Sequence, residues 1–202
     1  MPELAKNIAT QISKLASENE KDRQDAAYEL FRLGCAAIEP TLQKWFADPE
    51  FRALAAGMGS GLLTVGIAVQ RARFEEIRER FRQPKLADVP ADQDALEFGL
   101  SFAHGVRLDV LAVRTAGEEG AIAKFLARFG EGIQQVECNV RDVARATEIV
   151  RKHFGIEPIY PTVRAGANHT RVNFFLVPIA GERKILVELV EAAKSSKRSK
   201  TT

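Results

Sequence analysis

The sequence predicts an α+β fold in which a helical N-terminal region precedes a duplicated sheet region. Over residues 1–60 apolar residues recur at helical spacing, and residues 61–191 contain the order strand, helix, strands twice. Within the second region several strands alternate apolar and polar residues, which is typical of strands that bury one face. We therefore divide the chain into an all-helical cap at 1–60, a sheet domain at 61–192 and a tail at 193–202.

The helical region contains an apolar stripe and a repeated motif. Leu4, Ile8, Ile12 and Leu15 fall on one helical face. The motif Arg23–Ala27 returns 29 residues later as Arg52–Ala56. We interpret the first copy as a HEAT-like helical hairpin with its turn at Gly34, and the second copy as the start of another hairpin. The three glycines between residues 57 and 61 end this second copy. About three repeats are needed for a solenoid. We expect a cap on the next domain or a dimer contact, with an independent partner-binding array as the alternative.

The sheet region starts each of its two copies with a strand and a helix. Gly66–Val69 precedes a helix with Phe74 and Ile77 on one face, and Glu137–Val140 precedes a helix that Gly155 is suited to end. The further strands are expected at Ala95–Ala103, Arg107–Val113, Glu157–Tyr160, Arg171–Val177 and Ile185–Glu191, and a short bridging helix near Glu119–Phe129.

Composition is that of an ordinary globular protein, with 46% hydrophobic and 28% charged residues. We find no signal peptide or membrane-spanning run, and Cys35 and Cys138 are too isolated for a disulfide framework or a thiolate metal site. These features favour a cytoplasmic protein without a membrane partner.

The C-terminal tail accounts for the net positive charge. Residues 193–202 hold four of the 29 Lys and Arg residues, so the remaining 25 face 27 acidic residues. Short Ser/Lys tails are usually disordered, and we expect a disordered basic tail and no nucleic-acid binding.

Two stretches resemble a known family. Ala121–Val140 (AIAKFLARFGEGIQQVECNV) and Ile185–Glu191 (ILVELVE) are similar to the glyoxalase, or vicinal oxygen chelate, superfamily, and most closely to methylmalonyl-CoA epimerase. In that branch a helix ending AKFL precedes a GEGIHHIAFEV-like strand, and the last strand reads L(I/V)EL. The resemblance covers residues 61–191 and implies paired βαβββ modules whose sheets curl around a cleft.

The same resemblance implies a divalent metal, held by two His, a Gln or Glu and a terminal Glu, which polarises a substrate carbonyl. These ligand positions fall at Thr64, Asp109, Gln135 and Glu188, so both histidines are replaced. Zinc, cobalt and nickel favour imidazole, whereas oxygen ligands suit magnesium or calcium. We expect a degenerate metal site without a cofactor, and a weakly bound divalent cation is the alternative.

Other polar side chains are expected to face the cleft with these positions. Strand alternation predicts that Val172, Phe174 and Leu176 face the core. The polar residues of the strands are then expected on the opposite face, toward the cleft. The expected ligand-binding residues are Thr64, Ser101, Arg107, Asp109, Gln135, Glu137, Asn139, Arg171 and Asn173. Polar strand faces also commonly meet solvent, so the cleft depends on the curl of the sheet. We interpret His104 and His153 as surface residues, and His169 as a loop residue that could reach the cleft mouth.

These features favour a protein that binds a polar or anionic small molecule without metal-dependent catalysis. The alternative is an epimerase-like isomerase or a glyoxalase-like lyase in which Glu97 and Glu188 trade a proton across the cleft. A third possibility is a scaffold in which the helical cap does the work. Relatives of this fold commonly pair, so we expect a homodimer, although the cap could instead cover that surface and leave a monomer.

Overall fold

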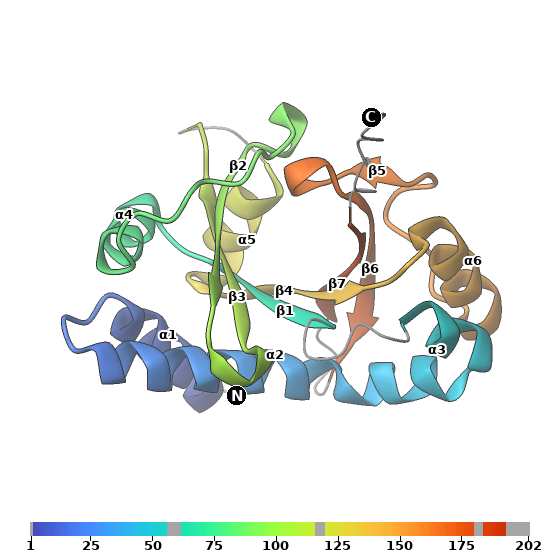
Figure 1. Ribbon diagram of the computed structural model, residues 1–202, viewed down its shortest axis with the longest axis horizontal. Coiled ribbons are helices and arrows are strands. Elements are labelled where there is room, and N and C mark those ends of the chain that lie inside the picture. The colour runs from blue at the N-terminus through green and yellow to red at the C-terminus, as the bar shows by residue number, and fades with distance from the viewer. Residues whose placement is uncertain (1, 56–61, 116–119, 180–183, 193–202) are drawn as a thin grey trace, which may run out of the picture.

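Seven strands form one curved, mixed sheet, and a long helix runs beneath it (Figure 1). The computed structural model describes residues 2–55, 62–115, 120–179 and 184–192. The helices are α1 (Pro2–Leu15), α2 (Glu20–Ala47), α3 (Pro49–Ala55), α4 (Arg71–Arg80), α5 (Ala121–Phe129) and α6 (Val143–Phe154). The strands are β1 (Leu63–Ala68), β2 (Ala95–Ser101), β3 (Arg107–Val113), β4 (Gly132–Asn139), β5 (Arg164–Ala165), β6 (Arg171–Pro178) and β7 (Lys184–Glu191).

The sheet consists of two similar halves in the order β2-β3-β1-β4-β7-β6-β5. The first strand of each half pairs in parallel with the last, β1 with β3 and β4 with β7. Antiparallel pairing of β1 with β4 joins the halves, with Val65 opposite Val136. The duplication predicted from the sequence is therefore confirmed, as is the α+β fold of paired modules that curl into a half-barrel with an N-terminal helical extension.

Helix α2 lies across the outer face of the sheet and is continuous through residue 34, so the turn predicted at Gly34 is wrong. A Cβ on Gly34 would stand 2.6 Å from Cγ2 of Val65 in β1. The glycine therefore allows the helix to approach the sheet rather than ending it. The N-terminal helices are present, but their HEAT-like relationship is not confirmed, and the glycines between 57 and 61 lie outside the described residues.

The N-terminal helices and the sheet share one hydrophobic core. Trp45 of α2 is 1% exposed, and its ring centroid lies 5.3 Å from that of Phe51 in α3 and 6.1 Å from that of Phe175 in β6. We expect Leu30, Leu33, Ile38 and Leu42 to be buried from their helical spacing; Leu30, Ile38 and Leu42 are buried, whereas Leu33 is half-buried. Burial of a side chain of this size stabilises the fold by about 1.5–3 kcal/mol, so the helical region is bound tightly to the sheet.

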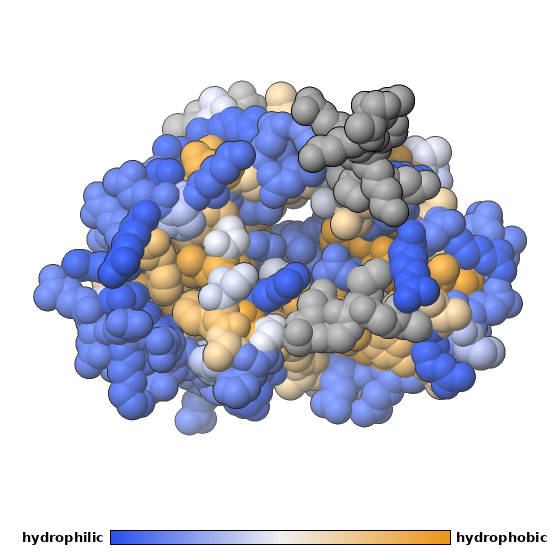
Figure 2. All heavy atoms as spheres, in the orientation of Figure 1, coloured by the Kyte–Doolittle hydropathy of each residue, from blue (hydrophilic) through white to orange (hydrophobic). Residues whose placement is uncertain are grey.

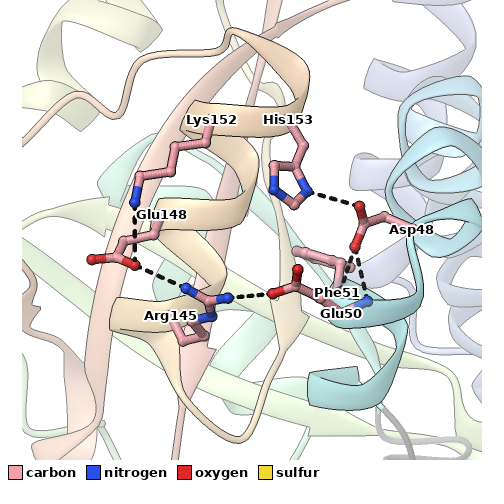
Figure 3. A network of polar contacts seen from close by, with 7 residues as sticks. All are labelled: Asp48, Glu50, Phe51, Arg145, Glu148, Lys152 and His153. Atoms are coloured by element: carbon pink, nitrogen blue, oxygen red, sulfur yellow. Dashed lines mark hydrogen bonds and ion pairs between the residues drawn. The ribbon is translucent and has the colours of Figure 1, made fainter.

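A polar network at the protein surface also joins α3 to α6 (Figure 3). Arg145 of α6 pairs with Glu50 of α3, and His153 Nδ1 lies 2.8 Å from Asp48 Oδ2. Asp48 Oδ1 accepts hydrogen bonds from the backbone N–H groups of Glu50 and Phe51 at the start of α3. Because Arg145, Glu50 and His153 are exposed, these ion pairs fix the helix orientation more than they stabilise the fold.

Other sequence predictions have mixed outcomes. Gly155 ends α6 with φ 66°, as predicted, and Cys35 and Cys138 are free thiols. The strand expected at Glu157–Tyr160 is reduced to an isolated bridge between Pro158 and Phe175. No helix among the described residues is long and apolar enough to cross a membrane. The predicted basic tail lies outside the described residues.

Candidate functional site

A cavity of about 900 Å³ lies on the inner side of the curved sheet, between its two halves. Strands from both halves line it, together with α5 and the segments at 85–93 and 159–170. Figure 2 shows the molecule hollowed between the halves, with hydrophilic residues inside the hollow. The cavity is large enough for a small metabolite, since ligand pockets commonly measure 300–1,000 Å³.

The four positions implied by the family resemblance meet in this cavity. Thr64 of β1, Asp109 of β3, Gln135 of β4 and Glu188 of β7 all line it. Register explains the meeting, because Gly66 pairs with both Asp109 and Gln135, and Glu137 pairs with both Thr64 and Glu188. The remaining predicted residues that line the cavity are Glu97, Ser101, Arg107, Glu137 and Asn139.

Arg171 and Asn173 do not line the cavity, and the assignment of faces on β6 was wrong. Phe174 and Leu176 line the cavity instead, and Leu176 is 46% exposed. Arg171 forms an ion pair with Glu191 at 2.9 Å, and the Asn173 amide donates to the Tyr160 carbonyl at 3.3 Å. Both polar side chains therefore have hydrogen-bond or ion-pair partners of their own.

Four carboxyl groups on the strands, Glu97, Asp109, Glu137 and Glu188, line the cavity, and we call them the carboxyl cluster. Gln135 Nε2 donates to Glu188 Oε2 at 2.7 Å and to Glu137 Oε1 at 3.1 Å. Glu137 also shares a hydrogen bond with Asp109. A hydrogen bond between two carboxyl groups requires a proton on one of them, so the cluster is at least partly protonated.

Burial and mutual repulsion favour the neutral forms of the cluster. Burial, with the charge of Asp109, raises the pKa of Glu97 to about 8. Burial also raises the pKa of Asp109 to about 6, although its hydrogen bond with Glu137 and the charge of Arg107 act in the opposite direction. The pKa values of Glu137 and Glu188 lie well above normal because of burial first and neighbouring carboxyls second. At neutral pH the cluster can therefore donate hydrogen bonds as well as accept them.

A glycine makes room for the amide that bridges the cluster. A Cβ on Gly66 would stand 2.6 Å from Gln135 Cγ and 3.1 Å from Leu111 Cδ1. The Gln135 side chain therefore crosses β1 at the one position where β1 has no side chain. The central strands thus position Gln135 between the halves of the sheet.

Several lining residues were not predicted. They include the basic residues Lys85, Lys124, Arg128, Arg164 and Lys184, the aromatic residues Phe125, Phe129 and Tyr160, and Gln134. Lys124 and Arg128 are spaced by four on the amphipathic helix α5, a signal that the sequence offers. The sequence offers no such signal for Gln134. A β-bulge in β4, opposite Gly66 and Ile67, breaks the alternation of the strand, so that Gln134 and its neighbour Gln135 both line the cavity.

Two segments from opposite halves meet at the edge of the cavity. Asp88 N–H donates to Asn168 Oδ1 at 3.1 Å, and Asn168 N–H donates to the Asp88 carbonyl at 2.9 Å. Arg164 pairs with Asp92 and lies over the Tyr160 ring, with 4.3 Å from Cζ to the centroid. These contacts join the outer ends of the two halves, so the sheet and its loops surround the cavity.

The histidines lie away from the carboxyl cluster. His153 belongs to the surface network of Figure 3, and His104 packs edge-on against Tyr28. The His169 side chain is 82% exposed and lies 3.5 Å from Asp88. None of the three is among the residues that line the cavity. In the described part of the chain, no three His, Cys, Asp or Glu residues are grouped as a metal ion would require.

Comparison with solved structures identifies similar proteins. Methylmalonyl-CoA epimerase from Mycobacterium tuberculosis is 32% identical, with a TM-score of 0.55, and the match covers 70% of this chain and 93% of that chain. Methylmalonyl-CoA epimerase (S115T) from Streptomyces coelicolor, in complex with 2-nitronate-propionyl-CoA, is 24% identical, with a TM-score of 0.53 and coverages of 65% and 94%. The hypothetical protein BH1468 from Bacillus halodurans C-125 is 22% identical, with a TM-score of 0.54 and coverages of 67% and 96%. No family model and no curated protein matches the sequence.

Proposed function

We propose that this chain, which belongs to the methylmalonyl-CoA epimerase family of the vicinal oxygen chelate superfamily, binds a small polar or anionic metabolite without metal-dependent catalysis. The observation that carries this proposal is the set of side chains in the cavity. The four positions where the family's metal ligands fall supply a hydroxyl, an amide and two carboxyl groups, from Thr64, Gln135, Asp109 and Glu188.

This set does not fit the transition metal that the family resemblance implies. Zinc, cobalt and nickel sites favour imidazole or thiolate nitrogen and sulfur ligands, and both imidazole positions are replaced here. The Gln135 amide nitrogen, a donor with no affinity for a cation, lies between the Glu137 and Glu188 oxygens at 3.1 and 2.7 Å. We therefore assign no reaction step to a metal.

The remaining groups are suited to binding. The carboxyl cluster offers hydrogen bonds to a polar head group, while Phe125, Phe174 and Leu186 offer an apolar wall. Exposed Lys and Arg side chains at the cavity edge give a second, positively charged region. A ligand with polar ends and an apolar middle would contact all three regions.

The competing function is an isomerase or lyase that uses Glu97 and Glu188, both of which line the cavity. Two carboxyl groups could move a proton to and from opposite faces of a planar enolate. Without a strong electrophile to stabilise the enolate, however, the largest catalytic contribution is missing. We therefore place binding ahead of catalysis.

Incubation with methylmalonyl-CoA in heavy water separates the two functions. We expect deuterium at the α-carbon to stay at the level of a protein-free control. Incorporation that depends on enzyme concentration and is lost in Glu97→Gln, but kept in the exposed Glu79→Gln, would establish the competing function. Mass spectrometry of the re-isolated thioester provides the readout.

The assembly that we propose is a homodimer, because the sheet ends in the edge strands β2 and β5. We propose the cytoplasm as its compartment because Cys35 and Cys138 are free thiols. Light scattering should give twice the chain mass of 22.3 kDa at micromolar concentration. A mass equal to that of one chain would show that the edges are protected within the monomer.

A further inference from the structure

We infer that two copies of this chain pair through their α2 helices, which lie antiparallel to each other along an apolar groove beside α2. This inference rests on the proposed homodimer and names the surface through which its two chains meet. It follows from the groove itself, from the positions of the charged side chains along it, and from the small residues at its centre.

The groove, which we call the α2 groove, runs along α2 beside the starts of β1 and β3. It has a volume of about 1160 Å³. Its apolar lining includes the half-buried side chains of Phe31, Cys35, Phe46 and Leu63. Apolar side chains that are still partly exposed favour a partner that removes the rest of their surface from water. The α2 groove is therefore suited to covering by a second protein surface.

The α2 groove is long enough for a pair of helices. Its lining on α2 extends from Asp25 to Ala47, which corresponds to about 33 Å of helix at 1.5 Å per residue. The edge strand β5, by contrast, has only two residues. The family resemblance covers residues 61–191, so most of the α2 groove belongs to the part of the chain outside that resemblance.

The charges of the α2 groove are complementary to those of a second copy. When a twofold axis passes between Cys35 and Ala36, near the middle of the lining, two α2 helices run antiparallel, and residues equally far from the axis face each other. Arg32 then faces Glu39 of the second copy, and symmetry repeats this contact. Both side chains line the groove and are exposed. One arginine and one glutamate in each chain therefore give two ion pairs across the interface.

The same arrangement keeps the other acids of the groove away from one another. Asp25 falls opposite Phe46 of the second copy, and it keeps its own ion pair with Lys21. Glu29 falls opposite Leu42 of the second copy, and the Asn7 amide donates to its Oε1 atom at 3.3 Å. No repulsion between acids therefore opposes this register.

Arg32 is free to change partners, and the residues at the axis allow the helices to come close. Within one chain Arg32 pairs with Glu29 at 2.7 Å, and its side chain is 63% exposed. Exposed ion pairs of this kind contribute little to stability, so Arg32 can turn to Glu39 of the second copy at small cost. The distance between packed helices depends on the side chains at the contact. Cys35 and Ala36 are small, so they suit a close crossing.

Charge reversal in the full-length protein tests the inference. Sedimentation equilibrium at low salt measures the dissociation constant of the dimer. Arg32→Glu and Glu39→Arg should each raise it by roughly tenfold or more, because each creates two like-charge contacts across the axis. The combined variant Arg32→Glu/Glu39→Arg exchanges the charges and should return close to the wild-type value. Lys44→Glu reverses an exposed charge of α2 outside the groove lining and should change nothing.

A second route does not depend on these two residues. Ala36 is exposed in the single chain, so Ala36→Glu should keep the melting temperature of the monomer near the wild-type value. It should nevertheless weaken pairing strongly, because two carboxylates would meet at the axis in a contact that excludes water. The melting temperature of every variant shows whether it is folded.

Three results would overturn the inference. One is a dimer whose dissociation constant is the same in Arg32→Glu, Glu39→Arg and Lys44→Glu, which moves the pairing to another surface, such as the sheet edges, and leaves the proposed homodimer in place. Another is a combined variant that pairs no more tightly than the two single variants, since the two residues then do not face each other. The third is a wild-type protein that stays at the mass of one chain, 22.3 kDa, at every concentration measured. This last result would overturn the homodimer as well and leave the groove to a different protein.

Discussion

The side chain of Gln135 lies against the bare backbone of Gly66, where a Cβ would stand 2.6 Å from Gln135 Cγ. These two residues belong to β4 and β1, the strands that join the two halves of the sheet, and they are paired in register. The contact directs the Gln135 amide toward Glu137 and Glu188. One backbone position therefore sets the geometry of the carboxyl cluster.

The substitution Gly66→Ala should disturb both stability and the cluster. The added methyl group meets Gln135 Cγ and Leu111 Cδ1 inside the packing limit, so we expect a loss of about 1–3 kcal/mol in the free energy of unfolding. Urea unfolding of the single variants and of Gly66→Ala combined with Gln135→Ala forms a double-mutant cycle. The second change should recover much of the loss. Additive effects would show that the clash lies elsewhere.

The substitution Gly34→Ala tests how closely the helical region packs on the sheet. Alanine in a helix is normally more stable than glycine by about 1 kcal/mol. Here the new Cβ would stand 2.6 Å from Val65 Cγ2 in β1, so we expect a lower melting temperature instead. The double variant Gly34→Ala/Val65→Ala should have a higher melting temperature than Gly34→Ala alone, because the smaller side chain removes the clash. A variant more stable than the wild type would contradict the observed contact between α2 and β1.

The carboxyl cluster should make stability fall as pH rises. The folded-state pKa of Glu97, about 8, lies above its ordinary value of 4.5. The folded state therefore favours the protonated acid, so the stabilisation is complete below pH 4.5 and is lost as pH rises toward 8. Glu97→Gln cannot ionise, so its unfolding free energy should decline less over this range. Parallel curves for wild type and variant would contradict the raised pKa.

Periodicity predicted the strands β3 and β7 well because each has a long run of apolar residues with a clear register. It could not predict which face of β6 meets the cavity, since Phe174 and Phe175 are adjacent and both faces of that strand are partly apolar. A glycine within a helical pattern also has two interpretations. Gly34 was interpreted as a turn, and only the position of Val65 distinguishes a turn from a close approach.

The candidate site was predictable where it depended on strand alternation within one half. Glu97 and Ser101 on β2, and Glu137 and Asn139 on β4, line the cavity as alternation indicates. The bulge at Gln134 and the loop contact between Asp88 and Asn168 depend on pairing across the halves. No local pattern encodes such long-range pairing, so the sequence could not reveal them.

We propose that this cavity binds its ligand without a transition metal, and the metal content of the purified protein tests this proposal. Elemental analysis of protein purified without chelator should find zinc, cobalt and nickel far below one ion per chain, because Thr64 and Gln135 replace both imidazoles. Glu188→Ala should then leave the trace content unchanged. A content near one ion per chain in the wild type that disappears in Glu188→Ala would contradict the claim.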